Sequence, residues 1–302
     1  MSATDTRSLN VFAPAKVNLY LHVTGRLDNG YHTLDSLVAF TDIGDQIEIT
    51  PAPEFQFSID GPYAKGFSPK EIDHSPDSSN LVVQAAWALA RMAQKIPSVH
   101  IRLTKNLPLA SGLGGGSSDA AAVIWGLLEW WKLPRDTQGL QSLMTRLGAD
   151  VPACFSCRPS RLRGIGDILD PTPPMGEVPI ILINPGKPCM TADVFSRFTG
   201  GFREPVALPK NLETLNDLLG FLDKQNNDLL KPALDTVPEI KNVLQSLSAS
   251  KSCLLSRMTG SGASCFGLFK TQEEAKETAK KIQNDKPGWW IKSGWLNRPE
   301  RY

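Results

Sequence analysis

The sequence has few cysteines and few histidines, which limits the chemistry that it can carry. Five cysteines and four histidines occur among 302 residues. The cysteines are too sparse a set for a disulfide framework. Cys154 and Cys157 form one C-x-x-C pair, a spacing that zinc and redox sites also use. A closed zinc site needs four ligands, and the other cysteines are single and scattered. We therefore expect both residues to be helix or core thiols.

A large net charge and a long hydrophobic run are also missing. Lys and Arg number 32 against 31 for Asp and Glu, a net charge of +1, so no overall field favours nucleic acid or a membrane surface. No stretch approaches the roughly 20 apolar residues that span a bilayer, and the N-terminal residues MSATDTRSLN lack the apolar segment of a secretory signal. We expect a cytoplasmic protein without a nucleic-acid or membrane partner.

Alternating apolar residues predict a long first strand. Every odd position from Val11 to Val23 is apolar, and a period of two places one face of a strand on a core. The even positions then carry Lys16, Asn18, Tyr20 and His22. We expect these four side chains to point in one direction.

The rest of the chain mixes strands and helices without an internal repeat. Further strands are predicted at 45–50, 55–59, 99–105, 178–184 and 289–296, and helices at 81–92, 117–131, 140–147, 191–198, 212–222 and 240–247. Residues 61–80 are interpreted as a surface connection and 163–174 as a turn-rich linker. Thr191 is expected to cap its helix, and Thr271 to form a capping box with Glu274. The order predicts an α+β protein of two lobes, residues 1–155 and 156–302.

The stretch PLASGLGGGSSDAAA, from Pro108 to Ala122, is unusually rich in glycine. It follows a predicted strand and opens a predicted helix, where N–H groups without intrahelical partners meet the positive end of the helix dipole. Such a loop binds anions, most often phosphate. The Walker A pattern needs a lysine at position 117 and the dinucleotide pattern needs a glycine there, whereas Ser117 occupies it. A merely structural glycine loop stays the alternative.

Several segments together resemble the GHMP kinases, the superfamily of galactokinase, homoserine kinase and mevalonate kinase. The glycine-rich stretch is similar to their phosphate-binding motif, APAKVNLYLHV to their first motif, and MTGSGASCFGLF to their third. LGADVPACF and TGRLDNGYHTLDSL are similar to the members that act on a cytidine diphosphate sugar alcohol. The resemblance covers nearly the whole chain in the right order. It implies a two-lobed fold with an N-terminal mixed sheet and helices and a C-terminal α/β sandwich-like lobe.

The resemblance also implies an ATP-dependent kinase that uses Mg²⁺ and phosphorylates such a small-molecule alcohol in the synthesis of isoprenoid precursors, as a monomer or weak homodimer. Asp150 is implied as the catalytic base and Lys16 as its partner. These roles suit the chemistry, because transfer to an alcohol needs a carboxylate that takes the hydroxyl proton and a cation that offsets developing charge. Taken alone, Asp150 could be an N-cap before Pro152, and Lys16 a solvated strand lysine.

The remaining site residues also follow from the resemblance. Tyr31 and Phe195 are implied to stack on cytosine, His32 to recognise its polar edge, and Asn18 and Thr191 to contact polar groups of the substrate. Without the resemblance, the segment NGYH is a hairpin tip and Phe195 a core residue. The nucleotide is implied at Asn80, Leu81, Lys105, Pro108, Leu109, Ala110, Ser111, Gly112, Leu113, Gly114, Gly115, Gly116, Ser117 and Ser118. No metal ligand is identified.

Some positions depart from the family pattern. Asp167 stands where glutamate is more usual, Leu162 and Arg163 replace small residues, and residues 109–111 replace a more glycine-rich run. These departures concern loops and not the pair Lys16 and Asp150. Two alternatives stay open, a GHMP kinase for another small alcohol and a non-catalytic relative that binds nucleotide.

Overall fold

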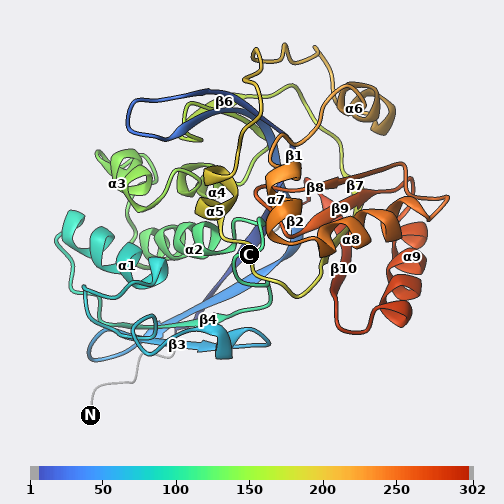
Figure 1. Cartoon of the computed structure of the whole chain (residues 1–302). Helices are drawn as coiled ribbons and strands as arrows, with labels where there is room; N and C mark the ends of the chain where they lie inside the picture. Colours follow the sequence, from blue (N-terminus) through green and yellow to red (C-terminus); the bar gives the residue numbers. More distant parts are fainter. Residues whose placement is uncertain (1–6, 299–302) are drawn as a thin grey trace.

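Two long antiparallel strands run between the two halves of the molecule. The computed structural model describes residues 7–298, so most of the N-terminal segment MSATDTRSLN lies outside the described residues. β1 (Leu9–Arg26) pairs with β2 (His32–Pro51) along most of its length. Figure 1 shows them as blue ribbons between a half that carries α1 to α4 and a half that carries α6 to α9. The predicted strands at 11–23 and 45–50 are parts of this longer pair.

The first sheet is mixed. β4 (Val99–Thr104) is antiparallel to β2 and parallel to β3 (Gln56–Asp60), and the hairpin of β5 (Ser160–Arg163) and β6 (Ile168–Pro171) pairs with the first part of β2. The interpretation of 163–174 as a linker is therefore wrong. β6 has no fully buried residue, so it lacks the apolar alternation from which a strand is predicted.

Four helices cover the first sheet on one side. They are α1 (Leu81–Met92), α2 (Gly115–Trp130), α3 (Leu140–Leu147) and α4 (Val151–Ser156). Their apolar faces form one core with β1, β2 and β4. Cys154 is buried in α4 and Cys157 is its C-cap residue, which places both at the end of a helix. Among residues 7–298, no cluster of three His, Cys, Asp or Glu residues could hold a metal ion.

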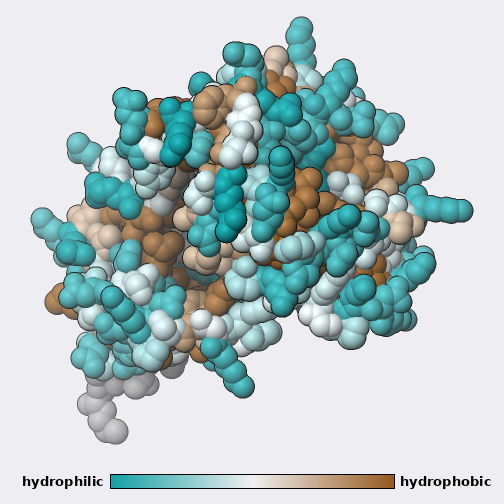
Figure 2. All heavy atoms as spheres, in the orientation of Figure 1, coloured by the Kyte–Doolittle hydropathy of each residue, from teal (hydrophilic) through white to brown (hydrophobic). Residues whose placement is uncertain are grey.

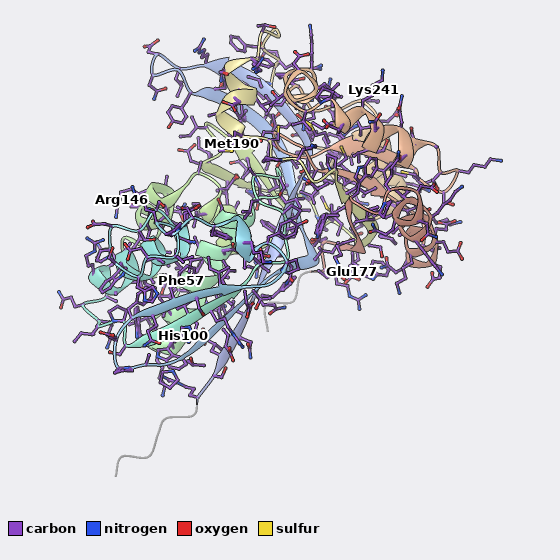
Figure 3. The ribbon with its side chains drawn as sticks, turned by 60° about the horizontal axis from the view of Figure 1, so that its bottom comes forward. Phe57, His100, Arg146, Glu177, Met190 and Lys241 are labelled. Atoms are coloured by element: carbon purple, nitrogen blue, oxygen red, sulfur yellow. The ribbon has the colours of Figure 1, made fainter. Side chains whose placement is uncertain are left out.

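The second half is an antiparallel sheet with helices. The strand order is β10 (Trp290–Leu296), β7 (Val178–Asn184), β9 (Cys265–Leu268) and β8 (Leu255–Met258), and β10 reaches β2 where Leu296 pairs with Thr41. Its helices are α5 (Thr191–Ser196), α6 (Leu215–Leu222), α7 (Leu230–Thr236), α8 (Glu239–Ser248) and α9 (Gln272–Asp285). In Figure 3, Phe57 and His100 mark the first sheet, Lys241 lies on α8, and Met190 lies between the halves. The predicted α+β class is confirmed.

Local capping explains where the helices begin. Thr271 and Glu274 form the expected capping box of α9. A second capping box, of Thr214 with Asp217, starts α6 at Leu215 rather than at the predicted residue 212. The prediction that Thr191 caps α5 is wrong, because Met190 is the N-cap residue and the Thr191 hydroxyl is bonded to Ser261.

The expected row of polar side chains on β1 is interrupted by a β-bulge. Asn18 pairs with Val38 and Tyr20 with Leu37, so Leu19 has no partner residue on β2. Because a bulge adds one residue to a strand with a period of two, the faces exchange beyond it. Tyr20 therefore joins the same core cluster as Leu19, and the prediction that all four polar residues point in one direction is wrong.

No helix among residues 7–298 is long and apolar enough to cross a membrane. The surface in Figure 2 is covered mainly by hydrophilic side chains, and it is hollowed between the two halves, where hydrophobic side chains come into view. The structure places a large pocket between these halves.

Candidate active site

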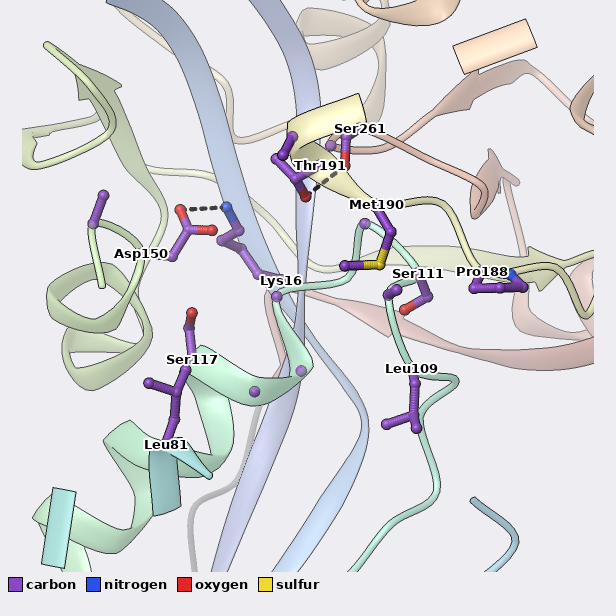
Figure 4. A pocket seen from close by; sticks show the side chains of 18 of the residues that line it. Lys16, Leu81, Leu109, Ser111, Ser117, Asp150, Pro188, Met190, Thr191 and Ser261 are labelled. Carbon is purple, nitrogen blue, oxygen red and sulfur yellow. Dashed lines mark hydrogen bonds and ion pairs between the residues drawn. The ribbon is translucent and has the colours of Figure 1, made fainter. Parts of the chain in front are cut away.

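One pocket of about 1380 Å³ connects the two halves of the molecule. This exceeds the roughly 300–1,000 Å³ of a typical small-molecule site, so two ligands can lie in it together. Its walls come from the loop between β1 and β2, the connection 61–80, the glycine-rich loop, the start of α4, and the loops before α5 and after β8. Figure 4 shows Lys16 and Asp150 between Leu81 and Ser117 below and Thr191 and Ser261 above.

The glycine-rich loop is packed tightly between β1 and the second half. The backbone N–H of Lys16 donates to Leu113 O at 2.9 Å. Gly112 has a φ of +76°, and a Cβ there would lie 2.5 Å from Thr259 O. Gly114, with a φ of +64°, is the N-cap residue of α2. The first two residues of α2, Gly115 and Gly116, line the pocket and carry no side chain, and a helix start of this kind binds anions.

Most of the predicted nucleotide residues line the pocket, and two do not. Leu113 is fully buried, and its carbonyl holds Lys16. Ser118 is also buried, and its hydroxyl donates to Pro14 O at 2.7 Å while its N–H donates to Gly114 O. The Leu113 carbonyl and the Ser118 hydroxyl and N–H are thus engaged within the protein, and the contact of these two residues with a nucleotide stays a prediction. The predicted nucleotide residues that do line the pocket are Asn80, Leu81, Lys105, Pro108, Leu109, Ala110, Ser111, Gly112, Gly114, Gly115, Gly116 and Ser117.

Lys16 and Asp150 form an ion pair at the centre of the pocket. Lys16 Nζ donates to Asp150 Oδ1 at 2.7 Å across 134 residues of sequence, and the two side chains are 5% and 35% exposed. Asp150 is indeed the N-cap residue of α4, with Pro152 in the first turn, but its side chain makes no capping hydrogen bond. The carboxylate is instead directed to Lys16 beside the start of α2. A carboxylate that keeps solvent access in this position can accept a proton from a bound hydroxyl.

Lys105 forms a buried group with two carboxylates. Its Nζ lies 2.6 Å from Asp45 and 2.5 Å from Asp119, and all three side chains are at most 3% exposed. Asp45 also accepts hydrogen bonds from the N–H groups of Asn106 and Leu107. Burial would lower the pKa of Lys105, but the two carboxylates outweigh it and raise the pKa. Lys105 thus ties the end of β4 to the start of α2, beneath the glycine-rich loop.

The charge of the Asp119 carboxylate is only partly compensated in this buried group. Burial raises the pKa of Asp119 well above its usual value, and the charge of Lys105 offsets only part of this effect. Asp119 Oδ1 has no hydrogen-bond partner among the described residues. The raised pKa favours the neutral form of Asp119, which reduces the negative charge under an anion-binding loop.

The end of the pocket next to α1 includes residues that sequence reasoning missed. Asn80 caps α1 through a hydrogen bond from Val82 N–H at 2.9 Å, and Leu81 follows it. Tyr63 and Phe67 also line this end, from the segment interpreted only as a surface connection. Two aromatic residues within a polar, glycine- and serine-rich segment were the available signal, because such rings provide surfaces for a planar base.

At the other end of the pocket, His32 stacks on Phe195. The ring centroids of His32 and Phe195 are 5.4 Å apart with an interplanar angle of 24°, and Phe198 meets His32 edge-on. Tyr31 lies at the tip of the β1–β2 hairpin, is 61% exposed and lines the same pocket. Partial burial, with a smaller effect of Arg26, lowers the pKa of His32. The ring is therefore neutral at pH 7 and can both donate and accept a hydrogen bond.

Asn18 and Thr191 also line the pocket, each held by a hydroxyl. Asn18 Nδ2 donates to Ser36 Oγ at 2.8 Å, and Thr191 Oγ1 lies 2.9 Å from Ser261 Oγ. Ser261, which sequence reasoning missed, belongs to the third glycine-rich segment, whose turn packs on Gly112. Residues from both halves thus meet around one centre.

Comparisons with known proteins agree with this geometry. Residues 80–158 match the model of the GHMP kinase N-terminal domain and residues 206–287 that of the GHMP kinase C-terminal domain. A 4-diphosphocytidyl-2-C-methyl-D-erythritol kinase of Mesorhizobium japonicum is 44% identical, over 95% of this chain and 96% of its own length. One of Paramagnetospirillum magneticum is 40% identical, over 94% and 97%.

Solved structures show the same relationship. A crystal structure of a 4-(cytidine 5'-diphospho)-2C-methyl-D-erythritol kinase has a TM-score of 0.76 and 30% identity, covering 95% of this chain and 99% of that one. Homoserine kinase of Cytophaga hutchinsonii, at 19% identity and a TM-score of 0.71, covers 98% of this chain and 96% of its own and shares the fold. The chain therefore belongs to the GHMP kinase superfamily and, within it, to the 4-diphosphocytidyl-2-C-methyl-D-erythritol kinase family.

Proposed function

We propose that this protein transfers the γ-phosphoryl group of ATP to the 2-hydroxyl of 4-diphosphocytidyl-2-C-methyl-D-erythritol, in the methylerythritol phosphate route to isoprenoid precursors. The observation that carries the proposal is the pair of Lys16 Nζ and Asp150 Oδ1, 2.7 Å apart, beside the start of α2. It lies between a glycine-rich anion site and a pocket end with aromatic rings. A kinase for a cytidine-containing alcohol needs these three parts in this order.

In this proposal, direct in-line transfer takes place at the centre of the pocket. Asp150 accepts the proton of the 2-hydroxyl, the new O–P bond forms, and the bond to the β-phosphate breaks to release ADP. Lys16 holds the Asp150 carboxylate in place through their ion pair and offsets the charge that develops on the transferred group. The amides of Gly115 and Gly116 and the hydroxyl of Ser117 hold the phosphates, with the adenosine towards Asn80 and Leu81.

The cytosine ring would bind at the end formed by Tyr31, His32 and Phe195. His32 is neutral at pH 7 and so can pair with both donor and acceptor atoms of the base. Asn18 and Thr191 would contact the alcohol and the diphosphate. Because His32 stacks on Phe195 at 5.4 Å, its ring must move aside before a base can stack between Tyr31 and Phe195.

Mg²⁺ is the expected metal, and the donor groups of the pocket fit it. Ser117 and Asp150 are oxygen donors that line the pocket, and the described residues contain no cluster of three carboxylates or histidines. Mg²⁺ commonly takes few protein ligands together with substrate phosphates and water. Bound there, it would neutralise phosphate charge.

We also propose a division of labour between the two lobes. Residues 1–155 supply the glycine-rich loop, Lys16 and Asp150, and residues 156–302 complete the site with Thr191, Phe195 and Ser261. The β5–β6 hairpin crosses this division, because it follows residue 155 in sequence but pairs with β2.

The test is ADP release from the purified protein with ATP, Mg²⁺ and 4-diphosphocytidyl-2-C-methyl-D-erythritol. Asp150→Asn should lower kcat by about 10²–10⁴-fold with unchanged nucleotide affinity by calorimetry. Asp193→Asn is the matched control, since Asp193 is an exposed carboxylate in the first turn of α5. Turnover only with homoserine, mevalonate or galactose would indicate another alcohol. ATP binding without turnover on any acceptor would indicate a non-catalytic nucleotide binder.

A further inference from the structure

The β-bulge in β1 decides which residues of that strand reach the pocket. Lys16 and Asn18, before the bulge, line the pocket, whereas beyond it Leu21 does. Leu19 is the inserted residue and has no partner on β2. Without the inserted residue, one part of β1 would have to shift by one residue along β2. Either the part beyond Asn18 would shift, or Lys16 and Asn18 would leave their present places. The local geometry of the bulge is therefore coupled to the geometry of the site.

Backbone groups at and next to the bulge are bonded to side chains from other elements. Leu19 O accepts a hydrogen bond from Arg257 Nη1 at 2.6 Å. Asn18 N–H donates to Thr259 Oγ1 at 2.8 Å, and Tyr20 O accepts from Ser36 Oγ at 2.5 Å. Two of these three partners, Arg257 and Thr259, come from the second half of the molecule.

Arg257 connects the bulge to the end of a helix. It lies on β8, and its Nη2 donates to Leu222 O at 2.9 Å and to Gln225 O at 2.7 Å. Leu222 is the last residue of α6, where carbonyl groups without intrahelical donors attract a cation. Burial lowers the pKa of Arg257 to about 10, so it stays positively charged at neutral pH. One planar guanidinium thus holds three carbonyls from two segments.

We propose that Arg257 is a positioning residue for phosphoryl transfer, which holds the bulge at Leu19 and thereby directs Lys16 and Asn18 into the pocket. Arg257 itself is not among the residues that line the pocket. The kinetic part of the proposal rests on the proposed function. Its structural part concerns the bulge alone and can be tested without any substrate.

A merely structural role for Arg257 predicts something different. In that case its loss would lower thermal stability, and any loss of activity would match that of another destabilising change in the same half. Positioning predicts a specific loss of kcat, because displacement of a catalytic group by about 1 Å costs on the order of 10²-fold. It also predicts that the KM for ATP changes little, since the glycine-rich loop makes the nucleotide contacts.

The experiment compares Arg257→Met, which keeps the chain length but removes the donors, with Arg257→Lys, which keeps the charge but not the planar fork. Leu247→Ala is the control, because Leu247 is fully buried in α8 and belongs to a different core cluster from the bulge residues. Each variant is assayed at the same interval below its own Tm. Hydrogen exchange of segments 16–22 and 9–14 is measured on the free protein.

We expect Arg257→Met to lower kcat by about 10–100-fold, with a KM for ATP within about threefold of the wild-type value. The kcat of Arg257→Lys should lie between those of the wild type and Arg257→Met. Leu247→Ala should keep kcat within twofold of the wild-type value. Exchange in segment 16–22 should be at least about tenfold faster in Arg257→Met, with segment 9–14 unchanged. If Arg257→Met does not fold, Arg257→Lys carries both measurements.

Three results would overturn the proposal. They are a kcat within twofold of wild type in the folded Arg257 variants, an equal loss in Leu247→Ala, and unchanged exchange in segment 16–22. If the wild-type protein itself does not phosphorylate the substrate, the proposed function fails, and the exchange measurement still decides whether Arg257 holds the bulge.

Discussion

Two lysines of the same pocket are used in opposite ways. Lys16 has one partner, Asp150, whose side chain is 35% exposed, whereas Lys105 has two, Asp45 and Asp119, which are 0% and 3% exposed. Both lysines are themselves nearly buried. The difference between the two regions lies in their carboxylates and not in the lysines.

This difference separates reactivity from support. A carboxylate with access to the pocket, balanced by one cation, can take up a proton during a reaction. A carboxylate that is nearly buried with a cation is shielded from solvent, and removal of that cation leaves an uncompensated buried charge. Lys16 should therefore matter mainly for turnover and Lys105 mainly for stability.

The largest expected effect concerns turnover. Lys16→Met and Asp150→Asn should each lower kcat by about 10²–10⁴-fold, and the double variant should lose little more than either single one, because the two residues act as a unit. Because Asp150 is partly exposed, we expect the free energy of unfolding to change by less than about 1 kcal/mol. Steady-state kinetics and urea denaturation measure both. Additive losses of kcat would contradict the paired role.

The next effect concerns stability. Lys105→Met should lower the free energy of unfolding by about 3–5 kcal/mol, because it leaves Asp45 and Asp119 without a cation. Asp119→Asn in that background should restore part of the loss, since an amide resembles the neutral acid that the raised pKa of Asp119 favours. Urea denaturation compares both with Lys16→Met. A smaller loss in Lys105→Met than in Lys16→Met would reverse the comparison.

A smaller effect distinguishes two adjacent serines at the start of α2. Ser118→Ala should lower the free energy of unfolding by about 1–3 kcal/mol, because Pro14 O loses its buried donor. Ser117→Ala should leave stability within about 0.5 kcal/mol and raise the KM for ATP, because Ser117 lines the pocket. Thermal denaturation and ATP titration provide the readouts. Equal effects of the two substitutions on KM would show that Ser118 also contacts the nucleotide.

The smallest effect is a pH dependence from His22. Burial, with a smaller effect of Arg203, lowers the pKa of this side chain in the folded protein, while Asp228 and Asp35 oppose the shift. The unfolded chain therefore binds more protons, and stability falls as the pH decreases through about 6.5. His22→Gln should make the fall in Tm between pH 7.5 and 5.5 shallower. An unchanged slope would contradict the inferred pKa.

Much of the architecture could be predicted from local sequence. Helix α1 has the predicted bounds, and the capping box of Thr271 and Glu274 starts α9 as expected. Apolar periodicity and capping residues are local signals, so neighbouring positions suffice to recognise them. The hairpin of β5 and β6 was missed because β6 is partly exposed and carries no alternation. The start of β2 at His32 was missed because its first residues are only partly buried and line the pocket, so they carry no regular apolar alternation.

The site was predictable in its motifs and not in its contacts. Lys16, Asp150 and the glycine-rich loop meet in one pocket, as the resemblance implied. The partners of Lys105 were not predictable, because Asp45 and Asp119 lie 60 and 14 residues away and nothing in the sequence links them. The stacking of His32 on Phe195 likewise depends on how the β1–β2 hairpin meets α5.

The sequence by itself determined the family, the glycine-rich loop at a helix start, and the residue types that phosphoryl transfer requires, because these follow from local patterns and from motifs in order. Only the tertiary structure decided which polar residues of β1 face the site. One inserted residue, Leu19, exchanges the two faces of the strand, and Arg257 and Thr259, more than 230 residues away, bond backbone groups at this point of the strand. Strand periodicity is a local property, whereas a bulge is stabilised by whatever the fold brings against it.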